Sequence, residues 1–146
     1  MEIRILIVED ELITMERIRD TLAMRGFDIA GTAASAHEAL AAIGKNMPDL
    51  ILMDIKIKGG MDGIELTRTI NAQYDIPVIF LTAFADRETV ERAKDVESYG
   101  YLVKPFGEIE LVTNIEIALH KHKLDRKLRE SEARYRTLFE TMRDAV

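Results

Sequence analysis

The chain of 146 residues has the length of one ordinary domain and is long enough to bury a hydrophobic core without metal or disulfide cross-links. Apolar residues make up 47% and charged residues 32%, which excludes a disordered chain and an integral membrane protein. No cysteine is present, so disulfides, thiolate metal sites and cysteine nucleophiles are also excluded. The longest apolar run near the N-terminus is too short for a signal peptide or a membrane span, so we expect a cytoplasmic protein that does not contact a membrane.

The net charge of −6 is distributed unevenly along the chain. Residues 1–106 carry 12 Lys/Arg and 18 Asp/Glu, whereas residues 107–146 carry eight of each kind. Phosphate binding needs a basic surface, so the acidic main body argues against nucleic acid as a direct partner. The change in composition near residue 107 is the first indication that the chain has two parts.

The sequence contains five short apolar runs, and each predicts a β-strand. The first, third and fourth include apolar stretches without alternation, which is typical of parallel strands covered on both faces. Apolar residues at helical spacing follow each of the first four runs. We therefore predict an α/β fold with a doubly wound parallel sheet and helices on both of its faces. The predicted strands are 3–8, 27–32, 50–53, 77–81 and 99–103, and the helical spacing covers 12–25, 36–43, 64–70 and 90–96.

Beyond residue 107 the pattern changes. Apolar residues from 111 to 119 predict a helix packed on the sheet, and no apolar strand follows His122. Residues then recur at alternating steps of four and three, as in a coiled-coil seam about three heptads long. Two interpretations stay open, a single solvated helix or a helix that leaves the domain to pair with a partner's helix. The seam consists of Leu124, Leu128, Ser131, Tyr135, Leu138 and Met142.

Ionisable or hydroxyl groups follow four of the predicted strands. Glu9 and Asp10 follow the first strand, Asp54 the third, Thr82 the fourth and Lys104 the fifth. The functional site of a doubly wound sheet lies at the carboxyl ends of its strands. Since these ends share one edge of the sheet, we expect the five side chains to converge.

Crowded carboxylates repel each other, by about 4 kcal/mol per pair at about 4 Å and an effective dielectric constant near 20. A fold retains such a cluster when a cation offsets the repulsion or when the acids share protons. Oxygen ligands without His or Cys select a hard cation, and Mg²⁺ fits best because it needs few carboxylates. With Lys104 and Thr82 beside the metal, Asp54 is equipped to accept a phosphoryl group.

Five motifs stand along the chain, at Ile5–Glu11, Leu52–Asp54, Met61–Gly63, Leu81–Ala83 and Gly100–Phe106. In order and spacing they closely resemble the receiver domain of two-component response regulators, over residues 3 to about 120. The resemblance implies a flavodoxin-like, five-stranded sheet of strand order 2-1-3-4-5. It also implies phosphorylation by a histidine kinase or a phosphotransfer domain.

The resemblance assigns Asp54 as the phosphoacceptor. Asp10, Asp54 and the backbone carbonyl of Lys56 would bind Mg²⁺ directly, and Glu9 would act through water or a more distant contact. A cationic Lys56 also stands at one of two variable positions that tune hydrolysis of the phosphoryl group, and a bulky Phe84 stands at the other.

The resemblance also implies a switch. Thr82 resembles the hydroxyl that moves toward the phosphoryl group, and Tyr101 the aromatic side chain that turns inward with it. Lys104 resembles the lysine that contacts the phosphoryl oxygens, and the bond from Lys104 to Pro105 is expected to be cis. The three histidines, at 37, 120 and 122, match no phosphodonor context and are predicted to lie on the surface.

We predict two parts, a receiver domain at 1–122 and, at 123–146, a helical linker with the start of a PAS-like domain. Residues 131–146 resemble the opening helix of a PAS sensory domain, so we expect the natural chain to continue, for instance into a hybrid histidine kinase. In the leading interpretation the phosphorylated receiver signals through Thr82 and Tyr101 to that C-terminal module.

Two alternatives remain. One is a dimerisation scaffold without a catalytic role, forming a homodimer through the C-terminal helix. The other is an aspartate-nucleophile phosphatase of the haloacid dehalogenase type, which needs an acid two residues after its nucleophile. Lys56 occupies that position here and disfavours the phosphatase. Beyond mediating its own phosphorylation and dephosphorylation, the chain carries no sequence signal that decides whether it is an enzyme.

Overall fold

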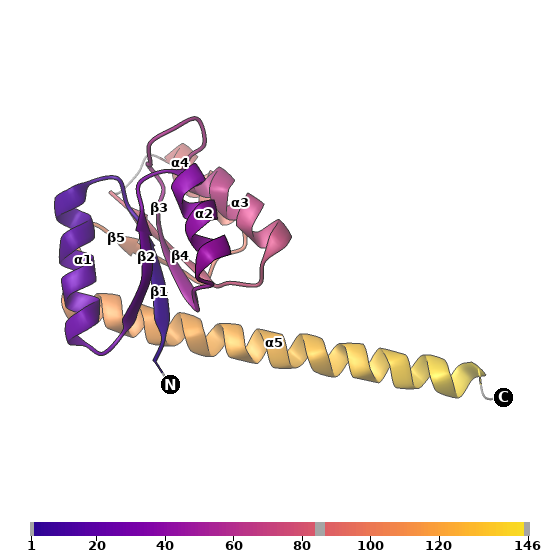
Figure 1. Cartoon of the computed structure of the whole chain (residues 1–146). Helices are drawn as coiled ribbons and strands as arrows, with labels where there is room; N and C mark the ends of the chain where they lie inside the picture. The colour runs from indigo at the N-terminus through magenta and orange to yellow at the C-terminus, as the bar shows by residue number, and fades with distance from the viewer. Residues whose placement is uncertain (1, 84–86, 145–146) are drawn as a thin grey trace.

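The computed structural model describes residues 2–83 and 87–144 (Figure 1). Five parallel strands form one sheet in the order β2-β1-β3-β4-β5, which confirms the predicted strand order. Each observed strand differs from its predicted apolar run by at most one residue at either end. The strands are β1 (Arg4–Val8), β2 (Asp28–Ala33), β3 (Leu50–Asp54), β4 (Val78–Thr82) and β5 (Gly100–Val103).

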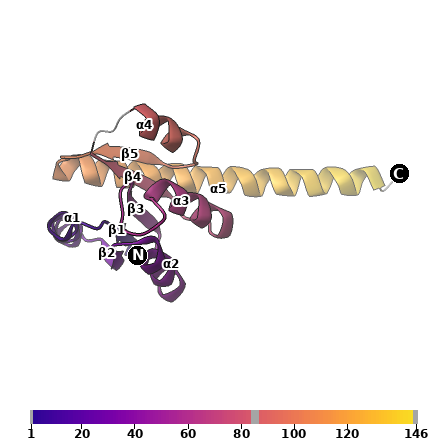
Figure 2. The ribbon, with the colours of Figure 1, turned by 90° about the horizontal axis from the view of Figure 1, so that it is seen from above.

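Helices cover both faces of the sheet, as predicted. One face packs against α1 and the first half of α5, and the other packs against α2, α3 and α4 (Figure 2). The interior strands β1, β3 and β4 contribute residues to both hydrophobic clusters, which explains their unbroken apolar runs. The helices are α1 (Leu12–Met24), α2 (Ala36–Lys45), α3 (Gly63–Gln73), α4 (Arg87–Lys94) and α5 (Glu108–Asp144).

Two of the helices begin after a side chain that caps them. The Ser35 hydroxyl accepts a hydrogen bond from the backbone N–H of Glu38, and the Asp62 carboxylate accepts one from the N–H of Glu65. Each bond satisfies an N–H group that has no partner within its helix. The predicted fourth helix ends two residues too late, because α4 ends at Lys94 and Val96 packs into the core after it.

Helix α5 is the most distinctive element. It is continuous over 37 residues, so the packed helix and the predicted seam are one element (Figure 1). Its first turns pack on the sheet through Leu111, Ile115 and Ala118. Its second half projects beyond the body of the domain, where the side chains of residues 131–143 are exposed. Residues 145–146 of the predicted PAS-like segment lie outside the described part of the chain.

Candidate functional site

The carboxyl ends of the strands bring the predicted residues together at one edge of the sheet. Asp54 is the last residue of β3 and Thr82 the last of β4, while Glu9 and Lys104 directly follow β1 and β5. Neighbouring strands are in parallel register here, with Asp54 opposite Leu81 and Thr82 opposite Val103. The topology of the sheet therefore determines which side chains share this edge.

Lys104 lies between two buried carboxylates. Its Nζ donates hydrogen bonds to Glu9 Oε1 at 2.6 Å and to Asp54 Oδ2 at 2.8 Å. Glu9 is 3% exposed and Asp54 6% exposed, so water screens these ion pairs poorly. Burial alone would lower the pKa of Lys104, but the hydrogen bonds to Asp54 and Glu9 outweigh it and raise the pKa. The lysine is therefore a fixed cation facing the Asp54 carboxylate.

Three carboxylates surround this position. One oxygen from each of Glu9, Asp10 and Asp54 lies within 4.8 Å of the others. The pKa of Glu9 is raised to about 7, mainly by burial and further by a hydrogen bond to Asp54. The hydrogen bond from Lys104 acts in the opposite direction and lowers this pKa. The cluster therefore carries more negative charge than one ammonium group offsets. Its donor atoms are all oxygens, which is the ligand type that Mg²⁺ prefers.

The backbone after β3 fixes the orientation of Asp54. Its Oδ1 accepts a hydrogen bond from the backbone N–H of Lys56 at 3.0 Å, so each carboxylate oxygen has a protein partner. Gly63 packs against the same segment, where its N–H donates to the carbonyl of Ile55 at 2.8 Å. A Cβ atom at Gly63 would overlap the carbonyl oxygen of Asp54. Sequence reasoning used Gly63 only as part of a motif and missed this close approach.

The two predicted switch residues lie on neighbouring strands. Thr82 is half-buried at the end of β4, and its carbonyl accepts a hydrogen bond from the N–H of Lys104 at 2.7 Å. Tyr101 is 44% exposed, stacks on Phe80 at a ring distance of 5.9 Å, and donates its hydroxyl to the carbonyl of Ala93 in α4. In this structure the aromatic ring therefore contacts α4 from outside the site.

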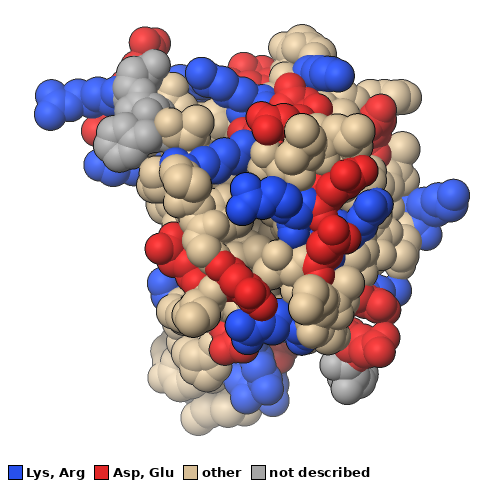
Figure 3. All heavy atoms as spheres, turned by 90° about the vertical axis from the view of Figure 1, so that its left-hand side faces the viewer, with Lys and Arg blue, Asp and Glu red and all other residues tan. Residues whose placement is uncertain are grey.

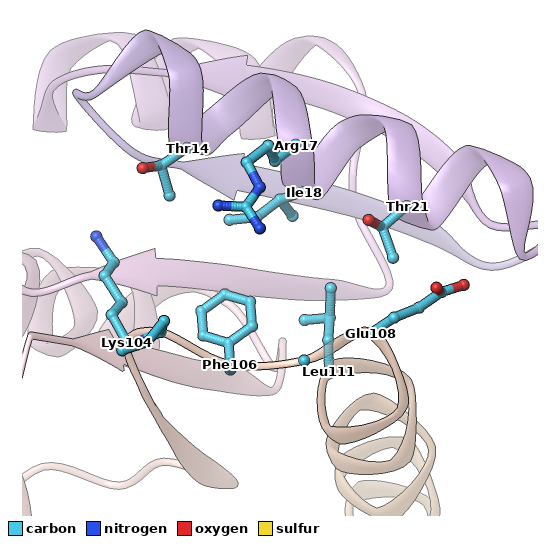
Figure 4. Close-up of a pocket in the computed structure, with 10 residues that line it drawn as sticks. Thr14, Arg17, Ile18, Thr21, Lys104, Phe106, Glu108 and Leu111 are labelled. Atoms are coloured by element: carbon cyan, nitrogen blue, oxygen red, sulfur yellow. The ribbon is translucent and has the colours of Figure 1, made fainter.

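A cavity of about 460 Å³ opens beside Lys104, between α1 and the segment that joins β5 to α5 (Figure 4). Arg17 and Ile18 line it from α1, and Phe106 lines it from the opposite side. The peptide bond between Lys104 and Pro105 at its rim is cis, as expected. On the face that carries α1, acidic and basic side chains are interspersed (Figure 3).

The prediction that all three histidines lie on the surface was wrong for His122. His122 is 9% exposed, its Nε2 hydrogen-bonds Asp75 Oδ1 at 2.9 Å, and its ring meets the edge of Tyr99. Asp75 also accepts from Arg129 at 3.2 Å and lies 3.5 Å from Arg126. These residues, with Asp125, form a polar cluster away from the strand-end site. Asp125 accepts a hydrogen bond from the Tyr99 hydroxyl at 2.7 Å.

Phe84, the second residue predicted to tune hydrolysis, lies outside the described residues. Lys56 is exposed. Its backbone N–H donates a hydrogen bond to Asp54, whereas the prediction concerned its backbone carbonyl as a ligand of Mg²⁺. None of the helices in the described ranges combines the length and the hydrophobicity that a bilayer span requires.

Sequence comparison identifies several relatives of known kind. The model of the response regulator receiver domain matches residues 5–116. The transcriptional regulatory protein PdtaR of Mycobacterium tuberculosis is 37% identical over 118 residues, which are 81% of this chain and 57% of that protein. The DNA-binding response regulator MtrA of Mycobacterium leprae is 33% identical over 122 residues, 84% of this chain and 53% of MtrA. The chain thus spans little more than half the length of these relatives.

Solved structures agree with the sequence matches. The signal receiver domain of a modulated diguanylate cyclase from Desulfovibrio desulfuricans G20 superposes with a TM-score of 0.81 at 37% identity, covering 86% of this chain and 99% of that one. The N-terminal domain of a response regulator/sensory box/GGDEF three-domain protein from Carboxydothermus hydrogenoformans gives 0.76 at 36% identity, covering 84% and 98%. With sequence and fold in agreement over most of its length, the chain belongs to the response regulator receiver domain family.

Proposed function

We propose that this receiver accepts a phosphoryl group on Asp54 from a histidine kinase or a phosphotransfer domain. The observation that carries the proposal is the position of Lys104, whose Nζ lies 2.8 Å from Asp54 and 2.6 Å from Glu9 at the strand-end edge. A buried carboxylate with a fixed cation beside it is suited to receive a group whose oxygens bear negative charge.

The residues at this edge fit a bound Mg²⁺. Glu9, Asp10 and Asp54 offer oxygen atoms that lie within 4.8 Å of each other. We propose that Asp10, Asp54 and the carbonyl of Lys56 hold the ion, with Glu9 at a greater distance. When bound, Mg²⁺ supplies positive charge that offsets the repulsion among the carboxylates and the incoming phosphoryl oxygens.

In the transfer step, a carboxylate oxygen of Asp54 forms a bond to phosphorus while the bond from phosphorus to the donor's imidazole nitrogen breaks. The imidazole leaves with the electron pair of that bond. Lys104 remains hydrogen-bonded at the site and donates to a phosphoryl oxygen, which stabilises charge on the transferred group. The N–H of Lys56, which already donates to Asp54 Oδ1 at 3.0 Å, keeps the carboxylate oriented during the transfer.

The donor is proposed to approach past the start of α1. Leu12 and Ile13 expose apolar side chains there, at 63% and 69%, and the cavity beside Lys104 opens on the same side. Nucleic acid is not a proposed partner of this chain, because its net charge is −6 and its charges of both signs are interspersed around α1 (Figure 3).

The output is proposed to pass through Thr82 and Tyr101 to α5 and a module that follows residue 146. The phosphoryl group carries a charge of about −1.5 to −2, in place of the single charge of the Asp54 carboxylate, and this charge attracts the Thr82 hydroxyl and lets Tyr101 turn from α4 into the site. The similar structure from Carboxydothermus hydrogenoformans is the N-terminal domain of a response regulator/sensory box/GGDEF three-domain protein, and this likeness supports the proposal of a PAS-like continuation at 123–146 here.

Treatment with acetyl phosphate and Mg²⁺ tests the proposal, with intact mass as the measurement. We expect one phosphoryl adduct on the wild-type chain, none on Asp54→Asn, and a strong reduction when a chelator removes Mg²⁺. Asp28→Asn is a matched control because Asp28 is an exposed aspartate on β2, and it should be phosphorylated like the wild type. An adduct that persists in Asp54→Asn would refute the assignment of the phosphoacceptor.

A second candidate function, the dimerisation scaffold, is favoured by the exposed apolar side chains on the projecting half of α5. In that case the oligomeric state does not depend on the strand-end site. Light scattering of the wild-type chain with and without beryllofluoride, and of Asp54→Ala, is read together with the phosphorylation assay. An identical oligomeric state in all three samples, with no phosphoryl adduct on the wild-type chain, would favour the scaffold.

A further inference from the structure

The seam of α5, defined as Leu124, Leu128, Ser131, Tyr135, Leu138 and Met142, remains uncovered in the folded domain. Its five apolar side chains are between 51% and 71% exposed. Leaving this much apolar surface in water on one helix is unfavourable, and such surfaces mark interaction sites in soluble proteins.

The seam lies on the exposed side of α5, and its first residue, Leu124, borders the domain beside residues 98–101. The buried His122 marks the inward face. Each residue of an α-helix is rotated by about 100° from the one before it, so Leu124 and Ser131 lie roughly 160–180° around the helix from His122. Ile117, one heptad before Leu124, is 46% exposed on the same outer stripe. A partner helix can therefore lie along the seam without displacing the domain's own packing.

The charges beside the seam are complementary to a second copy of the same chain. With Leu128 and Tyr135 at heptad position a, Lys127 falls at position g and Glu132 at position e. Position g of one helix faces position e of the following heptad in a parallel, in-register partner. Lys127 therefore faces the Glu132 position of a second copy, and two-fold symmetry gives this attraction twice.

The antiparallel arrangement is opposed by the same charges. When two copies of α5 pair antiparallel along the full length of the seam, position e of one helix faces position e of the other, and position g faces position g. Glu132 would then face its own copy, and so would Arg134. Like charges placed opposite each other are destabilising, so charge selects one direction of pairing.

From these observations we infer that two copies of the chain pair through the seam as a parallel, two-stranded coiled coil. The two receiver domains then lie at the same end of the pair, and the C-terminal ends of both helices leave side by side. The pairing does not depend on phosphorylation of Asp54. It positions whatever follows α5 as a symmetric dimer.

Sedimentation equilibrium of the 146-residue chain tests the charge argument. Lys127→Glu should weaken dimerisation roughly tenfold because two attractive pairs become repulsive. The double variant Lys127→Glu with Glu132→Lys should restore it. Glu130→Lys, an exposed charge reversal outside positions a, d, e and g, is the matched control and should leave dimerisation unchanged. A chain that is monomeric at about 1 mM, or forms trimers, would overturn the inference.

Cross-linking tests the direction, because the chain has no native cysteine. Met142→Cys should oxidise to a disulfide-linked dimer, since residue 142 faces its own copy in the parallel pair. In the antiparallel pair residue 142 faces residue 124. A disulfide that forms only when Met142→Cys is mixed with Leu124→Cys would overturn the parallel arrangement.

Discussion

Replacing Asp75 by alanine should loosen the attachment of α5 to the domain. Asp75 lies between α3 and β4 and binds three side chains of α5, with His122 at 2.9 Å and Arg129 at 3.2 Å the closest. Arg126 and Arg129 are about half exposed, so water screens their ion pairs with Asp75 and these pairs contribute little to stability. His122 is buried, and leaving its ring nitrogen without a partner costs about 1–2 kcal/mol.

The expected loss of unfolding free energy for Asp75→Ala is therefore about 2 kcal/mol, or about 1 M in the urea midpoint if the m-value is near 2 kcal/mol/M. Urea unfolding followed by circular dichroism measures it, and hydrogen exchange should accelerate at residues 119–129. Asp28→Ala, at an exposed aspartate, should change stability by less than about 0.5 kcal/mol. A double-mutant cycle between Asp75→Ala and His122→Ala that gives no coupling would refute the reasoning.

The contribution of Asp75 should also depend on pH. Burial would raise the pKa of Asp75, but the hydrogen bonds from His122 and Arg129 outweigh it and lower the pKa below its usual value. A carboxyl whose pKa is lowered by folding stabilises the protein above the unfolded pKa, about 3.9, and loses this contribution as pH falls through the folded pKa. The difference in unfolding free energy between the wild type and Asp75→Ala should therefore become smaller below about pH 4. A difference in unfolding free energy that is as large at pH 2 as at pH 7 would show that the ionised Asp75 carboxylate is not the cause of the stabilisation.

Three further predictions concern single residues. Gly63→Ala should cost about 1–3 kcal/mol in urea unfolding, because the new Cβ overlaps the carbonyl oxygen of Asp54, and an unchanged midpoint would contradict this. Ser35→Ala should cost about 1 kcal/mol through loss of the α2 cap, whereas Ser35→Asp should retain the cap and most of the stability. Lys104→Met should raise the pKa of Glu9 above its value of about 7, because the ammonium lowers it now. Carboxyl titration by NMR in metal-free protein would show no upward shift if that electrostatic account is wrong.

The strand-end site could be predicted from sequence because topology alone brings its residues together. Lys104 and Glu9 are 95 residues apart, yet each follows a parallel strand, so both must lie at one edge of the sheet. No comparable rule covers the contact between His122 and Asp75, which are 47 residues apart. One lies within a helix and the other in a loop, and only the packed structure brings them within hydrogen-bonding distance.

The end of α4 illustrates a second limit of sequence reasoning. Val96 fits the helical spacing of Val90 and Ala93, so the periodicity alone extends the helix. The chain instead leaves the helix after Lys94, and Val96 packs into the same cluster from a turn. The predicted burial holds for Ala93 and Val96 but not for Val90, which is 41% exposed. Apolar spacing indicates which side chains can face the core and not how the backbone brings them there.

Strand β5 links the strand-end site to α5 over a short distance. It has four residues, with Lys104 directly after it and Tyr99 directly before it. Lys104 binds Asp54, whereas the Tyr99 hydroxyl binds Asp125 in α5 at 2.7 Å. Burial, together with the hydrogen bond to Asp125, raises the pKa of Tyr99, so the hydroxyl stays protonated and keeps donating at physiological pH. Lys104 and Tyr99 flank the same four-residue strand, so a rigid displacement of β5 would move both side chains. Under the proposed switch, Tyr99→Phe therefore tests whether output depends on the hydrogen bond to Asp125, since it removes that bond, keeps the ring beside His122 and leaves Thr82 and Tyr101 intact.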